Sequence, residues 1–300
     1  DIQPNDRSVV FSGTLDGNGH TIDGLVINRP SESAVGLIAV SDGAVQNVHL
    51  TDVNITGSNQ VAGVAGAHIF GTITNVSVTG DVTATGSGSG SVVVGGLIGS
   101  TVASEVRNVS TTVEITTDPE SADDSIAAGG LIGDNGARTV RNVSAAGDIT
   151  ANGTAGGLIG RNSGITVRNA SATGDITAND TAGGLIGRNS GITVKNSFAT
   201  GDITANGAAG GLVGNDSGTT MRNVYATGDV VGDSDVGGLV GSGERLNVTS
   251  AYATGDVVGG SNVGGLIGYG ERLTVTSAYA TATVSGNANV GGLAGVADQS

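Results

Sequence analysis

A Gly-Gly-Leu sequence recurs in this chain every 27 residues, and this repeat constrains the fold more than any other feature. In the C-terminal half, the first glycine of each copy is Gly156, Gly183, Gly210, Gly237, Gly264 and Gly291. With the second glycine as marker, the series extends back through Gly130, Gly96, Gly63 and Gly36, which gives ten units. A fixed period of this size is typical of a solenoid, in which each unit is stabilised by its neighbours.

Two units are longer than the others. The markers Gly63 and Gly96 are 33 residues apart, and Gly96 and Gly130 are 34 apart, with the additional residues near 86–91 and 118–125. Surface insertions at one corner leave the stacked strands of a solenoid in register. The sequence therefore divides into an atypical capping coil (1–30), irregular coils with two loop insertions (31–130) and regular coils (131–300) of one continuous solenoid.

Each unit is predicted to form two or three short parallel strands. Residues 155–181 contain short β-branched runs separated by Gly, Asn, Ser and Asp, without an apolar stripe of helical period. The core of this unit is predicted to contain Leu158, Ile159, Ile165, Val167 and Ile176. The fold class is therefore all-β: a right-handed parallel β-solenoid of about ten coils, roughly 50 Å long at about 4.8 Å per coil.

The alternation of side chains along a strand assigns the two faces of the coil. The predicted inward side chains are Ala170, Ala172, Gly174 and Ile176, and the outward ones are Ser171, Thr173, Asp175 and Thr177. The inward residues are small, so we expect a narrow interior. This agrees with a chain that has no Trp, one Met and three Phe.

Composition limits the classes of function. The 300 residues include 55 glycines, 27 acidic and 12 basic side chains, and the net charge of −15 argues against nucleic acid as a partner. The chain has no cysteine for disulfides and no apolar run long enough to span a membrane. It shows no secretory leader, so we expect that a leader was removed or that the sequence begins within a longer protein.

The surface is also rich in Asp and poor in Lys. Of the acidic residues 21 are Asp, and Lys195 is the single lysine. Such a composition resembles that of proteins from salt-loving archaea. The alternative is an ordinary acidic secreted bacterial protein, because net charge determines solubility and not fold.

Several segments resemble the GLUG motif. They are the GGLIG and GGLVG sequences at 156–160, 183–187, 210–214, 237–241 and 264–268, the segment 250–255, and the preceding stretch 11–22. The resemblance implies a secreted or cell-surface protein of bacteria or archaea. It further implies that the repeats act as a β-solenoid stalk, spacer or adhesive surface, sometimes beside a catalytic domain such as a peptidase, and that the motif contains no catalytic residue.

An acidic column recurs at the repeat spacing. Its members are Asp148, Asp175, Asp202, Asp229 and Asp256. Stacked carboxylates about 4.8 Å apart predict a solvated, salt-dependent acidic ladder on an outer edge. Structural Ca²⁺ is the less favoured alternative, since calcium needs six to eight oxygens from a shaped loop. We therefore predict no metal site and no cofactor.

Three further columns follow the same period. Asn142, Asn169, Asn196 and Asn223 predict a buried amide ladder at a corner, which would shelter the glycosylation sequons at Asn142 and Asn169. The sequons at Asn152, Asn179 and Asn215 lie in stretches predicted to be loops and are the better glycan acceptors. The preceding row of Arg141, Arg168, Lys195 and Arg222 is interpreted as counter-charge to acids on adjoining edges.

An aromatic row is the main candidate for binding. It contains Phe198, Tyr225, Tyr252 and Tyr279, which the alternation places on the outside. Such a row could bind a partner subunit or a sugar. The alternative is that the rings pack only against each other and the neighbouring threonines.

The histidines do not predict an enzyme. His20, His49 and His68 lie at unrelated positions of early units, so neither a catalytic triad nor a zinc site is indicated. Parallel β-helix polysaccharide lyases and hydrolases are the alternative, and the segment 16–22 weakly resembles them. Their sites use distinct residues in irregular coils, whereas the columns of this chain repeat almost unchanged.

We therefore predict a non-catalytic extracellular or cell-surface protein that acts as a spacer, adhesin module or filament component. The predicted partners are further copies of the chain or other cell-surface proteins and glycans. Binding is expected through the aromatic and acidic columns.

Overall fold

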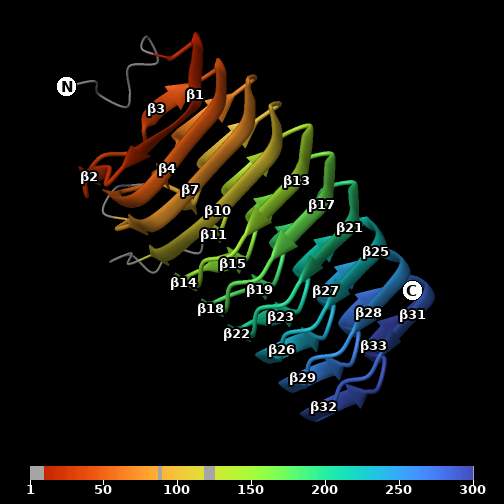
Figure 1. Cartoon of the computed structure of the whole chain (residues 1–300). Helices are drawn as coiled ribbons and strands as arrows, with labels where there is room; N and C mark the ends of the chain where they lie inside the picture. Colours follow the sequence, from red (N-terminus) through yellow and green to blue (C-terminus); the bar gives the residue numbers. More distant parts are fainter. Residues whose placement is uncertain (1–9, 87–89, 118–125, 300) are drawn as a thin grey trace.

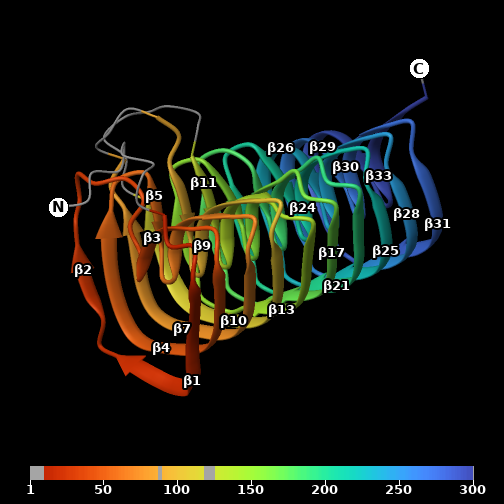
Figure 2. The same ribbon diagram turned by 90° about the horizontal axis from the view of Figure 1, so that it is seen from above.

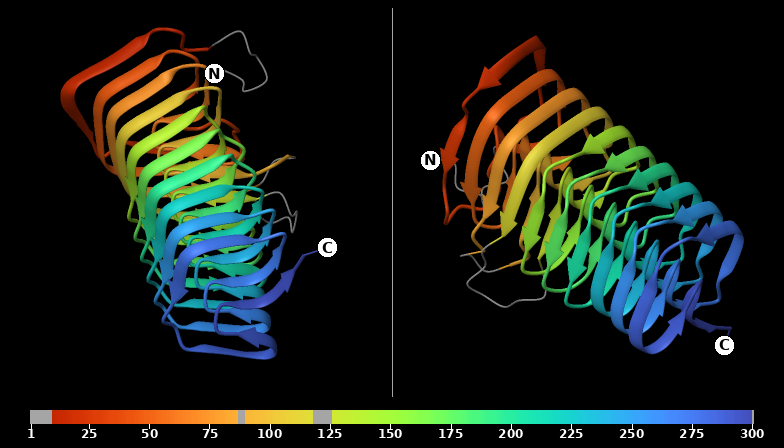
Figure 3. Two further views of the ribbon diagram at one scale, coloured as in Figure 1. Left: turned by 90° about the vertical axis from the view of Figure 1, so that its right-hand side faces the viewer. Right: turned by 60° about the horizontal axis from the view of Figure 1, so that its bottom comes forward.

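The chain folds into a single stack of parallel coils (Figure 1). The computed structural model describes residues 10–86, 90–117 and 126–299. The order of colours along the stack follows the sequence, so each coil lies against the coils that precede and follow it. The first described coil (residues 14–28) and the last (residues 274–298) lie at opposite ends of the stack in Figure 1 and in both views of Figure 3.

Two parallel sheets contain all the named strands, and helix is absent from the described residues. The ten-stranded sheet consists of β3 (Ile38–Ser41), β6 (Ala65–Ile69), β9 (Ile98–Val102), β12 (Ile132–Gly136), β16 (Ile159–Asn162), β20 (Ile186–Asn189), β24 (Val213–Ser217), β27 (Val240–Glu244), β30 (Ile267–Glu271) and β33 (Ala294–Asp298). The 23-stranded sheet consists of β1 (Thr14–Asp23), β2 (Val26–Asn28), β4 (Ala44–Gly57), β5 (Gln60–Ala62), β7 (Thr72–Ala84), β8 (Val93–Gly95), β10 (Glu105–Thr117), β11 (Ala127–Gly129), β13 (Thr139–Ala145), β14 (Ile149–Ala151), β15 (Thr154–Gly156), β17 (Thr166–Ala172), β18 (Ile176–Ala178), β19 (Ala182–Gly183), β21 (Thr193–Ala199), β22 (Ile203–Ala205), β23 (Ala208–Gly210), β25 (Thr220–Ala226), β26 (Val230–Gly237), β28 (Asn247–Ala253), β29 (Val257–Gly264), β31 (Thr274–Ala280) and β32 (Val284–Gly291).

These strands confirm the predicted all-β solenoid, with about ten coils and a regular spacing of 27 residues. The number of strands per coil differs from the prediction. Middle coils have four, such as β16 to β19, whereas later coils have three because β26, β29 and β32 each replace two short strands. The long early strands β4, β7 and β10 lie side by side along the lower edge of Figure 2, and from β13 onward a turn divides this path.

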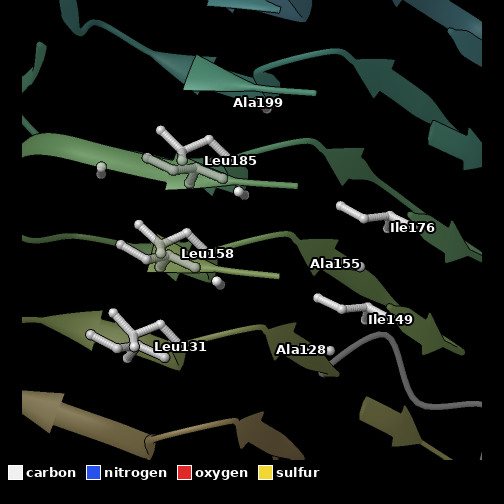
Figure 4. Close-up of a cluster of buried hydrophobic side chains, with 14 of the residues drawn as sticks. Ala128, Leu131, Ile149, Ala155, Leu158, Ile176, Leu185 and Ala199 are labelled. Carbon is white, nitrogen blue, oxygen red and sulfur yellow. The ribbon is translucent and has the colours of Figure 1, made fainter. Parts of the chain in front are cut away.

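The core is a set of aliphatic columns. Leu131, Leu158 and Leu185 are fully buried and lie one above the other, beside a second column that includes Ile149 and Ile176 (Figure 4). The small inward residues leave space only for these branched side chains, so each coil buries its apolar atoms against the next.

The predicted faces agree with the structure, with one correction in the core. Ala170, Ala172, Gly174 and Ile176 are buried, while Thr173, Asp175 and Thr177 are exposed. The expectation that Ile165 is a core residue was wrong. Ile165 is 50% exposed, and its counterpart Ile192 is 62% exposed. Both lie in the turn between the two sheets, where the strand alternation does not apply.

The repeated glycines mark a place where two backbones nearly touch. A Cβ atom at Gly183 would lie 2.0 Å from the carbonyl oxygen of Ile186, and one at Gly184 would lie 2.0 Å from that of Gly211. The Gly-Gly pair is therefore required by close approach. Left-handed backbone occurs instead at the corner residue Asn196, whose φ is 50°, because Asn tolerates this conformation better than most residues.

The predicted division of the solenoid remains a prediction. The first described coil contains β1 and β2, and its outer strand β1 is largely exposed. The predicted insertion at 118–125, and residues 87–89 of the one near 86–91, lie outside the described residues. No helix capable of crossing a membrane is found in the described segments.

Candidate functional site

The four aromatic rings form a continuous stack on the outer side of the 23-stranded sheet. Phe198, Tyr225, Tyr252 and Tyr279 lie on β21, β25, β28 and β31. Successive ring centroids are 4.8, 4.8 and 5.4 Å apart, with interplanar angles of 1°, 2° and 11°. The rings therefore cover each other's faces and turn their edges to solvent. Partial burial, followed by repulsion from the adjacent phenols, raises the pKa of Tyr252.

The acidic column has a structural role in addition to its charge. Its residues lie in the turn that follows β13, β17, β21, β25 and β28. Oδ1 of Asp175 accepts a hydrogen bond from the backbone N–H of Asp202 (2.8 Å), and Oδ1 of Asp202 accepts one from Asp229 (2.8 Å). The same bond joins Asp148 to Asp175 and Asp229 to Asp256. Each carboxylate therefore caps a backbone amide of the next coil.

The acidic column is an exposed ladder, as the sequence indicates. Each Asp uses one carboxylate oxygen, Oδ1, for a hydrogen bond within the stack. Among the residues that the structure describes, no three His, Cys, Asp or Glu side chains converge to hold a metal ion.

The corner asparagines form an exposed ladder, so the prediction of a buried one was wrong. Nδ2 of Asn169 donates to Oδ1 of Asn142 (3.0 Å), and Asn196 and Asn223 continue the series at 3.2 Å. Their φ angles of 50° to 54° turn the side chains outward at the corner. The sequons at Asn142 and Asn169 are therefore not sheltered by burial.

The other glycosylation candidates are exposed but differ in context. Asn152 and Asn179 lie in turns, and Nδ2 of Asn179 donates to Oδ1 of Asn152 (2.7 Å). Asn215 lies within strand β24, which corrects the prediction that it occupies a loop. Glycosylation at all three remains a prediction.

The basic row has counter-charge at one end only. Arg141 forms an ion pair with Glu105 at 3.1 Å. Arg168, Lys195 and Arg222 form none of the ion pairs found in the described part of the chain. The interpretation of this row as local counter-charge is therefore wrong for three of its four members.

A buried polar column inside the ten-stranded sheet is a feature that the sequence reasoning missed. Nδ2 of Asn135 donates to Oδ1 of Asn162, Asn162 donates to Asn189, and Asn189 donates to Oδ2 of Asp216, at 2.6, 2.6 and 2.7 Å. All four side chains are at most 3% exposed. The recurrence of Asn at 162 and 189 was a signal for this column, but the sequence does not show which of two Asn columns is inside.

The amide series ends at Asp216. Its carboxylate only accepts hydrogen bonds, so it needs no acceptor in the next coil. Its carboxylate also accepts hydrogen bonds from the backbone N–H groups of Gly218 (3.0 Å) and Thr219 (2.9 Å). Burial raises the pKa of Asp216 despite these bonds. In the next coil Gly243 occupies the equivalent position beside Leu246, so the column becomes apolar there.

The N-terminal end of the same column contains unsatisfied polar atoms. Ser41, His68 and Thr101 are register partners on β3, β6 and β9 and are at most 3% exposed. Oγ of Ser41 and both ring nitrogens of His68 have no hydrogen-bond partner among the described residues. Burial lowers the pKa of His68 to about 4, so its ring is neutral at pH 7.

The histidines do not form a catalytic constellation. His20 is exposed, and Nδ1 of His49 lies 2.8 Å from Oγ of Ser77. No carboxylate bonds the other ring nitrogen of His49 in the described segments, and His68 is buried on a different sheet.

A shallow groove of about 410 Å³ lies on the outer side of the ten-stranded sheet. Its charged lining consists of Asp134, Arg161 and Arg188, which are consecutive register partners. Arg188 pairs with Asp180 at 2.5 Å. Burial raises the pKa of Asp134 and lowers that of Arg161. The Arg-Asn-Ser sequence repeated at 161–163 and 188–190 is the sequence signal for this groove.

Comparison with known proteins identifies the repeat. The family model of the GLUG motif matches residues 151–177 and 178–204. Halomucin of Haloquadratum walsbyi is 43% identical over 107 residues, which are 35% of this chain and 1% of that protein. A protein of Evansella cellulosilytica described as a Gly-rich membrane protein is 35% identical over 77 residues, which are 24% of this chain and 9% of that protein. The chain thus spans a small part of either relative, and no solved structure matches it.

Proposed function

Residues 151–204 are two adjacent GLUG motifs within a parallel β-solenoid, and on this basis we propose that the chain is a non-catalytic repeat segment of a cell-surface or extracellular protein. It acts as a spacer and adhesion module. The resemblance to Halomucin and to a Gly-rich membrane protein supports this location. The Asp-rich surface is consistent with a salt-rich environment.

The observation that carries the proposal is the repetition of the outer surface. Four coils present a stacked aromatic ring at the same position, one Phe and three Tyr, and five present the same acidic residue. A catalytic site needs different groups that converge once on a reacting atom. A surface that repeats coil after coil instead suits an extended or multivalent partner, because weak contacts add along its length.

The rod itself supports the spacer role. Each coil adds about 4.8 Å to the length of the stack. The distance between the ends is therefore set by the number of coils and not by a flexible linker.

The proposed adhesive surface is the edge of the aromatic stack. Substitution Tyr252→Ser removes the ring that bridges Tyr225 and Tyr279. Two stacking contacts of about 0.5–1.5 kcal/mol each predict a loss of about 1–3 kcal/mol in the free energy of unfolding, with the solenoid still folded. Retention of the purified chain on cellulose, on chitin and on a surface coated with the chain itself measures adhesion. We expect wild type to bind at least one and Tyr252→Ser to bind it less.

Tyr269→Ser is the matched control, because Tyr269 lies on β30 in the other sheet. Its retention should equal that of wild type. Absence of retention on all three surfaces would contradict the adhesive role. Equal losses in both variants would show that the aromatic stack is not the binding surface.

A polysaccharide lyase or hydrolase is the second candidate, favoured by the groove that places Arg161 and Arg188 beside Asp134. Such enzymes combine acidic and basic side chains on one outer face. Incubation of the chain with polygalacturonate, followed by measurement of new reducing ends, tests it. If the chain cleaves the polymer and Arg188→Gln abolishes the cleavage, the chain is an enzyme and the non-catalytic proposal is wrong.

A further inference from the structure

Five cationic side chains form an uninterrupted row along the stack. Arg107, Arg141, Arg168, Lys195 and Arg222 lie on β10, β13, β17, β21 and β25, and each is the register partner of the next. The row contains five of the 12 basic residues of a chain whose net charge is −15. Such a concentration of positive charge is a distinct local feature of an otherwise acidic molecule.

Contacts among the described residues explain only the first two members of the row. Like charges directly opposite each other on adjacent strands are destabilising. Glu105 offsets this repulsion for Arg141 at 3.1 Å and, more weakly, for Arg107 at 3.9 Å. Arg168, Lys195 and Arg222 have no carboxylate partner in the described segments. Elsewhere the chain does pair exposed arginines, as Arg188 with Asp180.

The acidic column differs from the basic row in this respect. Each of its carboxylates from Asp148 to Asp256 accepts a backbone N–H from the following coil. The acidic residues therefore have a function in stabilising the stack. Among the described residues, the three cations without an ion pair show no equivalent function, so the row is available to an anion from outside the molecule.

The neighbours of the row indicate what kind of anion it fits. In each of three coils the cation is followed directly by a ladder asparagine and lies two residues after a partly exposed threonine, as in Thr193, Lys195 and Asn196. The surface thus repeats a cation, an amide and a hydroxyl about every 4.8 Å along the stack. This set matches a polymer in which each unit has one anionic group and several hydroxyls.

We propose that the basic row binds a linear anionic polysaccharide that runs along the stack, with the carboxylate or sulfate groups of the polymer on Arg168, Lys195 and Arg222. A single-stranded nucleic acid fits less well, because it needs open aromatic faces for its bases and the rings of this chain cover each other. The row uses different side chains from the aromatic stack, although Lys195 and Phe198 both lie on β21, and it goes beyond the adhesive role proposed above.

Binding of defined polymers to the whole chain tests this site. The probes are polygalacturonate, which carries carboxylates, dextran sulfate, which carries sulfates, and neutral dextran. We expect wild type to bind at least one of the two polyanions and not dextran. The triple substitution Arg168→Gln, Lys195→Gln and Arg222→Gln should weaken binding at least tenfold and reduce the salt dependence, the slope of log K against log salt, by about three.

A charge-matched triple variant provides the control. Arg138→Gln, Arg245→Gln and Arg272→Gln remove the same three charges outside the row, so polyanion binding should stay within twofold of wild type. If both triple variants bind polyanions equally weakly, the effect comes from net charge alone, and the proposed site is wrong. Failure of wild type to bind either polyanion would also overturn it. A preference between the two polyanions identifies carboxylate or sulfate as the recognised group.

Two further outcomes separate this proposal from alternatives. Sedimentation of the chain alone detects self-association. If the triple variant of the basic row loses self-association but still binds polyanions, the row binds a second copy of the chain and not a polysaccharide. The Tyr252→Ser variant should bind polyanions like wild type. A polyanion signal that survives in Tyr252→Ser therefore supports the basic row even where the aromatic stack fails as an adhesive surface.

Discussion

At the scale of single residues, the buried polar column contains two ionisable groups whose pKa values are shifted by burial. His68 lies near one end of the column and Asp216 at the other, and each is at most 2% exposed. Burial disfavours the charged form of both, which lowers the pKa of His68 and raises that of Asp216. Their contributions to stability therefore change with pH in opposite directions.

His68 should make the solenoid sensitive to acid. Its pKa is about 4 in the folded chain and 6.5 when unperturbed, so its stabilising effect is complete above about pH 6.5 and is lost as the pH falls through about 4. The shift corresponds to about 3 kcal/mol. The substitution His68→Thr introduces the residue found at the equivalent position Thr101 in the next coil. Between pH 7 and pH 4, the free energy of unfolding of this variant should fall by about 3 kcal/mol less than that of wild type. Denaturant titrations at each pH measure it.

The control is His20→Thr, because His20 is exposed. It should retain the acid sensitivity of wild type. An unchanged acid-induced loss in His68→Thr would show that His68 is protonated without cost in the folded chain.

Asp216 should produce the opposite slope. Because its pKa is raised from 3.8, the folded chain holds a proton that the unfolded chain has released, and stability falls as the pH rises from about 3.8 through the raised pKa. Asp216→Asn lacks this group. Both variants are measured in the His68→Thr background, which lacks the opposing effect of His68. The fall in the free energy of unfolding with rising pH should disappear in Asp216→Asn. It should persist in the control Asp233→Asn, because Asp233 is exposed. Identical slopes in the two variants would contradict this.

At the scale of elements, side-chain ladders add hydrogen bonds between coils where strands end or bend. A turn leaves N–H and C=O groups without strand partners, and such groups need another partner. The acidic column supplies acceptors at the turn after β21 and its equivalents, and the corner asparagines bond each other at the adjacent bend. The ladders therefore keep the coils in register where the sheets are interrupted.

Asp202 tests this role of the acidic column. Asp202→Ala removes the acceptor of the Asp229 N–H and should lower the free energy of unfolding by about 1 kcal/mol. Asp202→Asn retains an acceptor oxygen and removes a charge between two like charges, so its stability should equal or exceed that of wild type at low salt. Chemical denaturation at two salt concentrations compares them. Similar losses in both variants would show that the charge, and not the hydrogen bond, matters.

At the scale of the whole molecule, each coil depends on its neighbours for burial. Leu266 is fully buried, whereas its equivalent Leu293 in the last coil of the structure is 46% exposed. The two residues occupy the same position of the same repeat. Burial is therefore a property of the stack and not of a single coil.

A charge in the middle of the stack should separate it into blocks. Leu212 is fully buried between Leu185 and Leu239, so Leu212→Asp places an unpaired carboxylate in the core at a cost of several kcal/mol. We expect loss of the cooperative thermal transition, followed by circular dichroism. Ile192→Asp at a 62% exposed position should unfold like wild type. An unchanged transition in Leu212→Asp would remove Leu212 from the core.

Much of the architecture could be predicted because the repeat applies the same local rules many times. The 27-residue spacing required stacked coils, and the alternation from Ala170 to Thr177 assigned the two faces. Within a strand, successive side chains point to opposite faces by geometry alone. The leucine column and the outward positions of Asp175 and Tyr252 followed from that geometry.

The tertiary structure decided what happens where a strand bends. Sequence reasoning placed Asn169 inside and did not distinguish it from Asn162, because both recur at the same period of 27 residues. The left-handed backbone at Asn169, with a φ of 50°, turns its side chain outward, while Asn162 continues the alternation of β16 and is buried. Which polar groups lack a partner among the described residues, such as His68 inside and Lys195 outside, is decided by contacts between coils. Such contacts exist only when the coils are stacked, because the residues involved are distant in sequence.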